Sequence, residues 1–202
     1  MTQPSLPNVK IPVPAGNRGK DWESILARTH DHYRAIGLGV VFHIPNSWRY
    51  GGRPKQGADS ARHAATGDGR TLKRVKSAPD FVGSLSGRGI VFDAKSFSGA
   101  SIPYDQFDED RSGKQIEDLH DAWRGGNLAG YMVLEKRTMR VHWVEAEYVY
   151  KWRWNVTRGI KGTAKSINFS EVVDHRIRLL GVCDGFRFDY APLLIPACST
   201  RE

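Results

Sequence analysis

The sequence predicts an α/β domain in which a mixed central sheet is flanked by helices. Two segments, residues 22–36 and 116–123, carry apolar residues at spacings of three and four, which is typical of a helix with one buried face. Between and after them stand short runs rich in β-branched and aromatic residues, which are typical of strands. Helical and strand-like segments therefore alternate along the chain, an order that favours one sheet covered by helices.

The bounds of each element follow from these patterns and from the residues that end them. A helix is expected from about Gly19 to Gly37, since glycine often ends a helix. Residues 112–115 have the form of a capping box, which predicts the start of a second helix, and Gly125 and Gly126 predict its end. A short third helix is expected over residues 145–152. The expected strands are residues 38–44, 81–83, 89–95, 128–134, 138–144, 177–180 and 186–190.

Length and composition indicate one globular domain, expected over residues 17–202, after a flexible N-terminal arm of residues 1–16. Hydrophobic residues make up 40% of the chain and charged residues 26%, as in ordinary globular proteins. No apolar run approaches the roughly 20 residues that span a bilayer, and the proline-rich start lacks the apolar core of a secretory signal. We therefore expect a cytoplasmic protein with no membrane partner.

The net charge of +8 is concentrated in one segment. Residues 49–76 contain eight cations and two acids, together with several glycines and little apolar content. A protruding basic segment of this kind favours contacts with the phosphates of a nucleic acid, although a solvated loop without a partner has the same composition. The candidate DNA-binding residues in it are Arg53, Lys55, Arg62, Arg70, Lys73, Arg74 and Lys76.

The most informative motif is Asp80 followed, after a short turn, by Asp93-Ala94-Lys95. Alternate side chains of a strand share a face, so Asp93 and Lys95 are expected side by side. The turn-forming residues 84–88 would fold the preceding strand back as a hairpin and bring Asp80 close to Asp93. Two carboxylates suit Mg²⁺ and phosphodiester hydrolysis, with Lys95 positioning the nucleophile or neutralising charge. The alternative is a surface ion pair on an edge strand, with Asp80 as a turn residue.

Two other polar residues have two candidate roles each. Gln115 closes the N-terminus of its helix, which the spacing favours, or lies in the catalytic cleft and holds a water or phosphate. Glu23 reaches the active site, or is simply favoured by the dipole at the start of its helix. The aromatic residues near 152–154 form core packing, which helical spacing favours, or a surface on which bases stack.

A series of short motifs runs through most of the chain. They are Asn17-Arg18-Gly19 with Glu23, Ala78-Pro79-Asp80-Phe81 with Gly83, Gly87-Arg88, Phe92-Asp93-Ala94-Lys95-Ser96, Ile102-Pro103 with Phe107, Gln115-Ile116, Gly125-Gly126 and residues 143–150. In this order and spacing, the chain resembles the RecU family of Holliday junction resolvases, within the PD-(D/E)xK nuclease superfamily.

The resemblance implies a restriction-endonuclease-like fold with a protruding basic stalk, which would occupy residues from about 45 to 77 here. It further implies a homodimer that uses Mg²⁺ or Mn²⁺ to make paired, symmetric nicks in four-way DNA junctions during recombination and repair. Two other functions remain open. One is a less selective nuclease of the same superfamily, and the other is a protein that binds junctions without cutting them.

The resemblance also assigns roles to individual residues. Asp80 and Asp93 would be metal ligands together with the backbone carbonyl of Ala94, and Lys95 would be the catalytic lysine. Gln115 and Glu23 would lie in or beside the site, and Arg88 would assist phosphate binding. Asp93 stands where the family often has glutamate, so the carboxylate is carried on a shorter arm.

Overall fold

The computed structural model describes residues 20–44, 47–50, 72–75, 79–108, 112–171 and 174–194. The expected N-terminal arm, residues 1–16, lies outside these ranges. So does most of the expected stalk, of which residues 47–50 and 72–75 are described.

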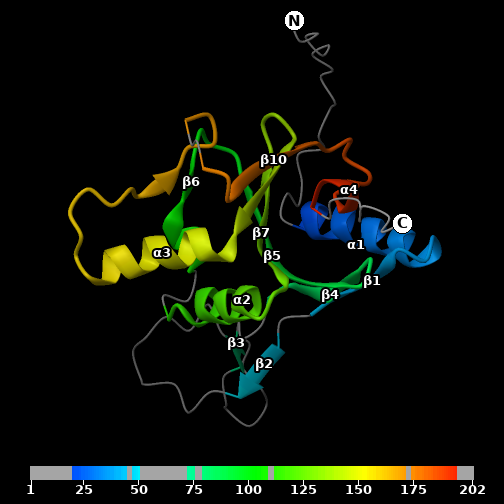
Figure 1. The fold of residues 1–202 in the computed structure, drawn as a ribbon, viewed down its shortest axis with the longest axis horizontal. Coiled ribbons are helices and arrows are strands. Elements are labelled where there is room, and N and C mark those ends of the chain that lie inside the picture. Colours follow the sequence, from blue (N-terminus) through cyan, green and yellow to red (C-terminus); the bar gives the residue numbers. More distant parts are fainter. Residues whose placement is uncertain are drawn as a thin grey trace, which may run out of the picture.

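A six-stranded mixed sheet forms the centre of the molecule (Figure 1). Its strands, in spatial order, are β1 (Gly39–His43), β4 (Phe81–Leu85), β5 (Arg88–Phe97), β7 (Leu128–Glu135), β8 (Arg140–Glu145) and β10 (Ile177–Val182). Neighbouring strands are antiparallel except β5 and β7, which are parallel. Parallel neighbours need a crossover connection, and this one contains the 3-10 helix η2 (Tyr104–Phe107) and the helix α2 (Lys114–Arg124). The expected α/β class with a mixed sheet is confirmed.

Helices cover the sheet on both sides (Figure 1). On one side lies α1 (Lys20–Ala35), joined by the C-terminal helix α4 (Ala191–Leu194). On the other side lie α2 and α3 (Ala146–Thr157). Two short ladders complete the described part: β2 (Ser47–Tyr50) pairs with β3 (Leu72–Val75), and β6 (Ile102–Pro103) pairs with β9 (Ser166–Ile167).

Alternation along the strands divides the buried side chains into two cores. The α1-side core contains Trp22 and Leu26 of α1 with Phe81 and Phe92 of the sheet, whose rings stack 4.9 Å apart. The α2-side core has Ile116 of α2 among its buried members. Along β5, Phe92 faces the α1-side core, so Asp93 and Lys95 face α2, as the period of two predicts.

The segment before α4 corrects one expectation. Residues 186–190 were expected to form a strand, but they form no strand and lie against α1 instead. The backbone amide of Phe188 donates to the hydroxyl of Thr29 at 3.0 Å, and the amide of Tyr190 donates to the hydroxyl of Tyr33 at 2.8 Å. Side chains of α1 therefore satisfy the amides that a neighbouring strand would otherwise bind.

The third helix is also longer than expected. The structure has α3 from Ala146 to Thr157 instead of over residues 145–152, so the aromatic and basic residues at 152–154 are helical. Trp152 stacks on Tyr104 with ring centroids 4.2 Å apart, which confirms the core interpretation for that residue, whereas Trp154 is 43% exposed. Within the described ranges no helix is long and apolar enough to cross a membrane.

Candidate active site

The β4–β5 hairpin places Asp80 against the Asp93-Ala94 pair. Phe81 is the register partner of Phe92, so Asp80, one residue before β4, lies opposite Asp93. The backbone amide of Ala94 donates to Oδ2 of Asp80 at 3.0 Å. Both carboxylates are buried, with exposed fractions of 6% for Asp80 and 0% for Asp93. The hairpin therefore places Asp80 next to Asp93, as the sequence predicted.

Lys95 lies on the same face as Asp93 and contacts it directly. Its Nζ is 2.8 Å from Oδ2 of Asp93, and both side chains are buried. The alternative of a surface ion pair on an edge strand is wrong, because β5 lies inside the sheet between β4 and β7. A buried ion pair loses much of its attraction to desolvation and is weak grounds for stability. Buried ionisable groups of this kind are concentrated at functional sites.

Gln115 belongs to this cluster and does not cap its helix. Its Nε2 donates to Oδ1 of Asp93 at 2.8 Å, and only 7% of the residue is exposed. The capping box expected over residues 112–115 is wrong, since α2 has Gly113 at its N-cap and no side-chain cap. With Gly113 at the N-cap, Gln115 is the second helical residue rather than the third. Of its two candidate roles, the structure shows the contact in the site.

These four residues come from a hairpin and a helix, and all of them lie within a range of the chain that matches a known family. A family model for RecU, recombination protein U, matches residues 17–194. The chain belongs to the RecU family. No curated protein matches the sequence closely. Membership of the RecU family implies a recombination-related function of the Holliday junction resolvase type.

Glu23, the remaining predicted site residue of this RecU-family chain, lies on the other side of the sheet. Its Oε2 is 3.6 Å from Nε2 of His43, and both side chains are about half exposed. The ring of His43 packs on Phe81, a member of the α1-side core, with centroids 5.0 Å apart. The structure thus brings together Asp80, Asp93, Lys95 and Gln115 and places Glu23 beside His43. A catalytic role for Glu23 stays a prediction.

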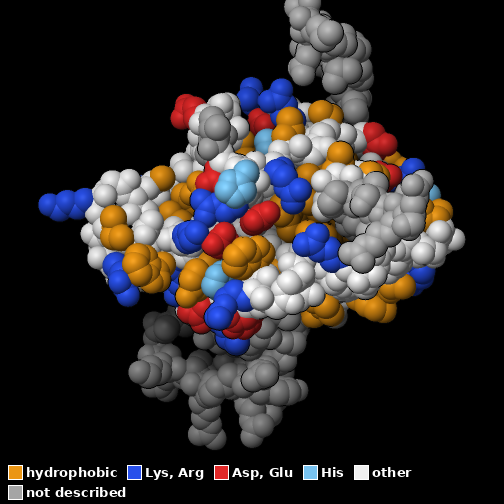
Figure 2. All heavy atoms as spheres, in the orientation of Figure 1, with side chains coloured by type: hydrophobic (Ala, Val, Ile, Leu, Met, Phe, Trp, Pro, Cys, Tyr) orange, Lys and Arg blue, Asp and Glu red, His pale blue; other side chains and the backbone are white. Residues whose placement is uncertain are grey.

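The predicted DNA-binding residues of this RecU-family chain are described in part. Lys73 and Arg74 lie in β3, where their register partners are Arg49 and Trp48 of β2. Arg88, the first residue of β5, is exposed at the hairpin turn. The others, Arg53, Lys55, Arg62, Arg70 and Lys76, lie outside the described residues. On the face drawn in Figure 2, basic and acidic side chains of the described residues are interspersed. This agrees with most of the excess positive charge belonging to residues 49–76.

The donors in the site fit a hard divalent cation. Asp80 and Asp93 supply carboxylate oxygens, and Ala94 supplies a carbonyl oxygen between Asp93 and Lys95. Mg²⁺ takes oxygen ligands, often one or two carboxylates with water and phosphate completing the shell. No group of three or more His, Cys, Asp and Glu side chains that could hold a metal is present in the described ranges, and this site offers two carboxylates. The chemistry of the donors therefore agrees with the expected Mg²⁺ or Mn²⁺.

Three residues around the cluster were not found by sequence reasoning. Tyr131, the register partner of Asp93, is fully buried, and burial together with the charge of Asp93 raises its pKa well above the usual value. Asp108 and Arg153 form an ion pair beside the start of α2. No local pattern identifies these residues, because the pairing of Tyr131 with Asp93 and the ion pair of Arg153 with Asp108 join segments that are far apart in the sequence.

Proposed function

We propose that this RecU-family chain is a Mg²⁺- or Mn²⁺-dependent endonuclease that makes paired, symmetric nicks in four-way DNA junctions. The observation that carries the proposal is the buried cluster in which Lys95 and Gln115 each contact one oxygen of Asp93 while Asp80 lies alongside. A protein that only binds DNA has no need of two buried carboxylates, which repel phosphate. Their presence beside a lysine supports hydrolysis.

Asp80, Asp93 and the carbonyl of Ala94 would hold the cation. When bound, the cation would polarise the scissile phosphodiester and lower the pKa of a water that becomes the nucleophile. The residues around the cation would orient its ligands and stabilise charge. Gln115 would keep Asp93 oriented, and the amide of Ala94 would do the same for Asp80. Lys95 would position the nucleophile or stabilise the charge that develops on phosphate oxygens.

Selectivity for junctions would come from shape rather than from base sequence. The basic residues 49–76 can contact phosphates, and such contacts position a protein on DNA without specifying a sequence. A four-way junction has a two-fold arrangement of strands that a symmetric homodimer matches. Each subunit would then place one active site on one of two opposing strands, which gives paired nicks.

The first experiment compares wild type with Asp93→Asn on a labelled synthetic four-way junction and on a linear duplex of equal length. Each reaction contains Mg²⁺, Mn²⁺ or EDTA. We expect symmetric, metal-dependent nicking of the junction that the substitution abolishes while junction binding persists. Equal cutting of both substrates would replace the proposal with a less selective nuclease. Tight binding by wild type without cutting in either metal would leave a junction-binding protein.

The assembly is tested on the same samples. Light scattering after size exclusion should give twice the chain mass for wild type and for Asp93→Asn, since the substitution removes a charge inside the site and not at a surface. Nicks on a single strand from a monomeric protein would contradict the symmetric mechanism. Thermal unfolding of both proteins shows whether the variant is folded.

A further inference from the structure

One arginine of the distant helix α3 contacts the chain both at the end of η2 and just before α2. Asp108, at the end of η2, accepts a hydrogen bond at Oδ1 from the backbone amide of Gly113 over 2.7 Å. Nη1 of Arg153, on α3, forms an ion pair with Oδ2 of Asp108. Nη2 of the same guanidinium donates to the carbonyl of Ser112 at 2.8 Å. Arg153 therefore binds Asp108 and Ser112 at the same time.

The position of Arg153 leaves no room for a side chain at residue 113. The φ of Gly113, 72°, lies in the left-handed region, and a Cβ placed there would lie 1.6 Å from Cζ of Arg153. A side chain at this position would thus be strained and would push the guanidinium away from Asp108 and Ser112. The backbone at Gly113 and the head of Arg153 occupy adjoining space that only glycine leaves open.

The contacts of Arg153 with Asp108 and Ser112, here called the clamp, lie directly before Gln115, the residue that binds Asp93. Gly113 is the N-cap of α2, and Gln115 is two residues further on. The amide of Glu117 donates to the carbonyl of Gly113 at 3.0 Å, so the first turn of α2 begins on the clamped residue. The N-cap residue Gly113 provides no side-chain cap, and Oγ of Ser112 accepts a hydrogen bond from the amide of Lys114 at 3.1 Å. Arg153 and Asp108 thus contact the two residues that precede the first turn of α2, which carries Gln115.

A buried tyrosine lies beside Asp93 in the sheet. Tyr131 is the register partner of Asp93, yet its hydroxyl forms no hydrogen bond with any residue in the described part of the chain. Phe107, the last residue of η2, packs its ring edge-on against Tyr131 with centroids 4.8 Å apart. Lys95 lies 2.8 Å from Oδ2 of Asp93, and Gln115 donates to Oδ1 of the same carboxylate at 2.8 Å.

We propose that Arg153 is a positioning residue for the metal-binding carboxylate. By binding Asp108 and Ser112 it fixes the first turn of α2, and the first turn holds Gln115 against Asp93. This inference rests on the proposed function in one respect, namely that Asp93 binds the cation. The hydrogen bonds of Arg153 go to Asp108 and Ser112 and to none of the proposed metal ligands. Its loss should act on metal affinity through Gln115 alone.

The test measures Mn²⁺ affinity by calorimetry without DNA, together with the free energy of unfolding. Arg153→Met should weaken Mn²⁺ binding, by at most the roughly 10- to 100-fold typical for loss of a partner that orients a ligand, since it acts through Gln115. Arg153→Lys keeps the charge but cannot form two contacts in one plane, so an intermediate loss is expected. Equal affinity in wild type and Arg153→Met would overturn the proposal.

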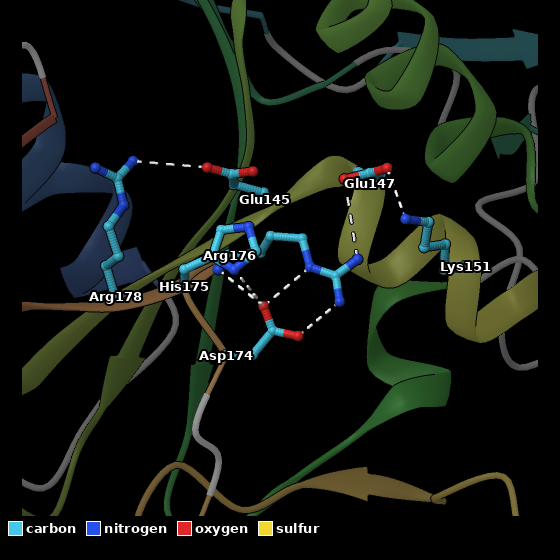
Figure 3. Close-up of polar contacts among 7 residues, drawn as sticks. All are labelled: Glu145, Glu147, Lys151, Asp174, His175, Arg176 and Arg178. Atoms are coloured by element: carbon cyan, nitrogen blue, oxygen red, sulfur yellow. Dashed lines mark hydrogen bonds and ion pairs between the residues drawn. The ribbon is translucent and has the colours of Figure 1, made fainter.

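Arg176 provides the matched control (Figure 3). It pairs with Asp174 at 2.6 Å, and both side chains are 20% exposed, much as Arg153 and Asp108 are 20% and 14% exposed. Figure 3 shows this pair next to Glu147 of α3, in a network that does not include α2. Arg176→Met should cost comparable stability and leave Mn²⁺ affinity within about twofold. The same loss of affinity in both variants would show a general effect of destabilisation and would overturn the proposal.

Two further variants separate this inference from the proposed function. If Arg153 acts through Gln115, Arg153→Met should add nothing to the affinity loss caused by Gln115→Ala, whereas independent effects would add. Gly113→Ala should reproduce Arg153→Met from the other side of the contact, and it serves where Arg153→Met fails to fold. Asp93→Asn is the reference. Unchanged Mn²⁺ affinity in Asp93→Asn refutes the metal role of that residue, whereas loss there with unchanged affinity in Arg153→Met and Gly113→Ala refutes only the positioning role.

Discussion

Nε2 of Gln115 donates to Oδ1 of Asp93 at 2.8 Å, and this hydrogen bond joins α2 to the central strand β5. It fixes one carboxylate oxygen of the candidate metal site, so Gln115→Ala should weaken Mn²⁺ binding by about 10- to 100-fold. Calorimetric titration of the purified protein measures this. Gln106→Ala, at an exposed position of η2, is the matched control and should bind as wild type does. Wild-type affinity in Gln115→Ala would contradict the assignment.

Replacing Lys95 should lower the stability of the protein much more than replacing a surface lysine, and it should also abolish cleavage. Lys95→Met leaves the buried carboxylate of Asp93 without its ammonium partner, which typically costs about 3–5 kcal/mol of unfolding free energy. Urea unfolding in EDTA measures this loss. We expect added Mg²⁺ to restore part of the stability, because the cation supplies positive charge to the same carboxylate. Junction cleavage should stay absent even then.

The control for this prediction is Lys151→Met. Lys151 lies 2.8 Å from Glu147, the same distance that separates Lys95 from Asp93, but its side chain is 60% exposed. Exposed pairs contribute at most about 1 kcal/mol, so the control should lose little stability. A loss at Lys95 no larger than the loss at Lys151 would mean that Lys95 does not balance a buried charge on Asp93.

The parts of the fold that were predicted from sequence depend on neighbours along the chain. A period of two in β5 separates Phe92 from Asp93 and Lys95, and this alternation needs no knowledge of the rest of the molecule. The hairpin follows from turn-forming residues within a few positions of Asp80. For the same reason the two acids and the lysine of the site could be named in advance.

The parts that were missed depend on contacts between distant segments. The start of α2 has the local pattern of a capping box, but its N-cap is Gly113, one residue later, in the left-handed region and bonded to Asp108, the ion-pair partner of Arg153. Residues 186–190 read locally as a strand, but hydroxyls of α1 bind their amides. A local pattern contains no information about either partner. The role of Gln115 was left open for this reason.

Two buried histidines should make stability depend on pH. Burial, with a smaller effect of His43, lowers the pKa of His30 to about 3, and burial lowers the pKa of His142 to about 4. Both are therefore neutral in the folded protein at pH 5, whereas in the unfolded chain they bind protons below about pH 6.5. Stability should fall as pH drops from about 6.5 towards 4, by up to about 1.4 kcal/mol per pH unit for each histidine.

Replacing one histidine isolates its share of this effect. His142 stacks on Phe169 with centroids 4.1 Å apart, so His142→Phe keeps the ring contact and removes the titrating group. Urea unfolding between pH 7 and 5 should show a shallower loss of stability in this variant than in wild type. His175→Gln, whose side chain is 91% exposed, is the control and should follow wild type. The same slope in all three proteins would contradict the prediction.

The basic segment gives a prediction that concerns DNA binding alone. Neutralising Lys73, Arg74 and Lys76 together should weaken binding to a four-way junction and leave Mn²⁺ affinity unchanged, because the proposed metal ligands lie in or next to the β4–β5 hairpin. Each lost phosphate contact reduces the slope of log affinity against log salt by about 0.9, so the slope per subunit should fall by up to about 3. Fluorescence anisotropy at several salt concentrations measures the junction affinity and its salt slope, and calorimetry measures the Mn²⁺ affinity.

The control neutralises Lys136, Arg137 and Arg140, three cations at the β7–β8 turn, and should keep the wild-type slope. Junction affinity that is unchanged at physiological salt would show that this segment does not bind the junction, while the candidate active site would be untouched by that result.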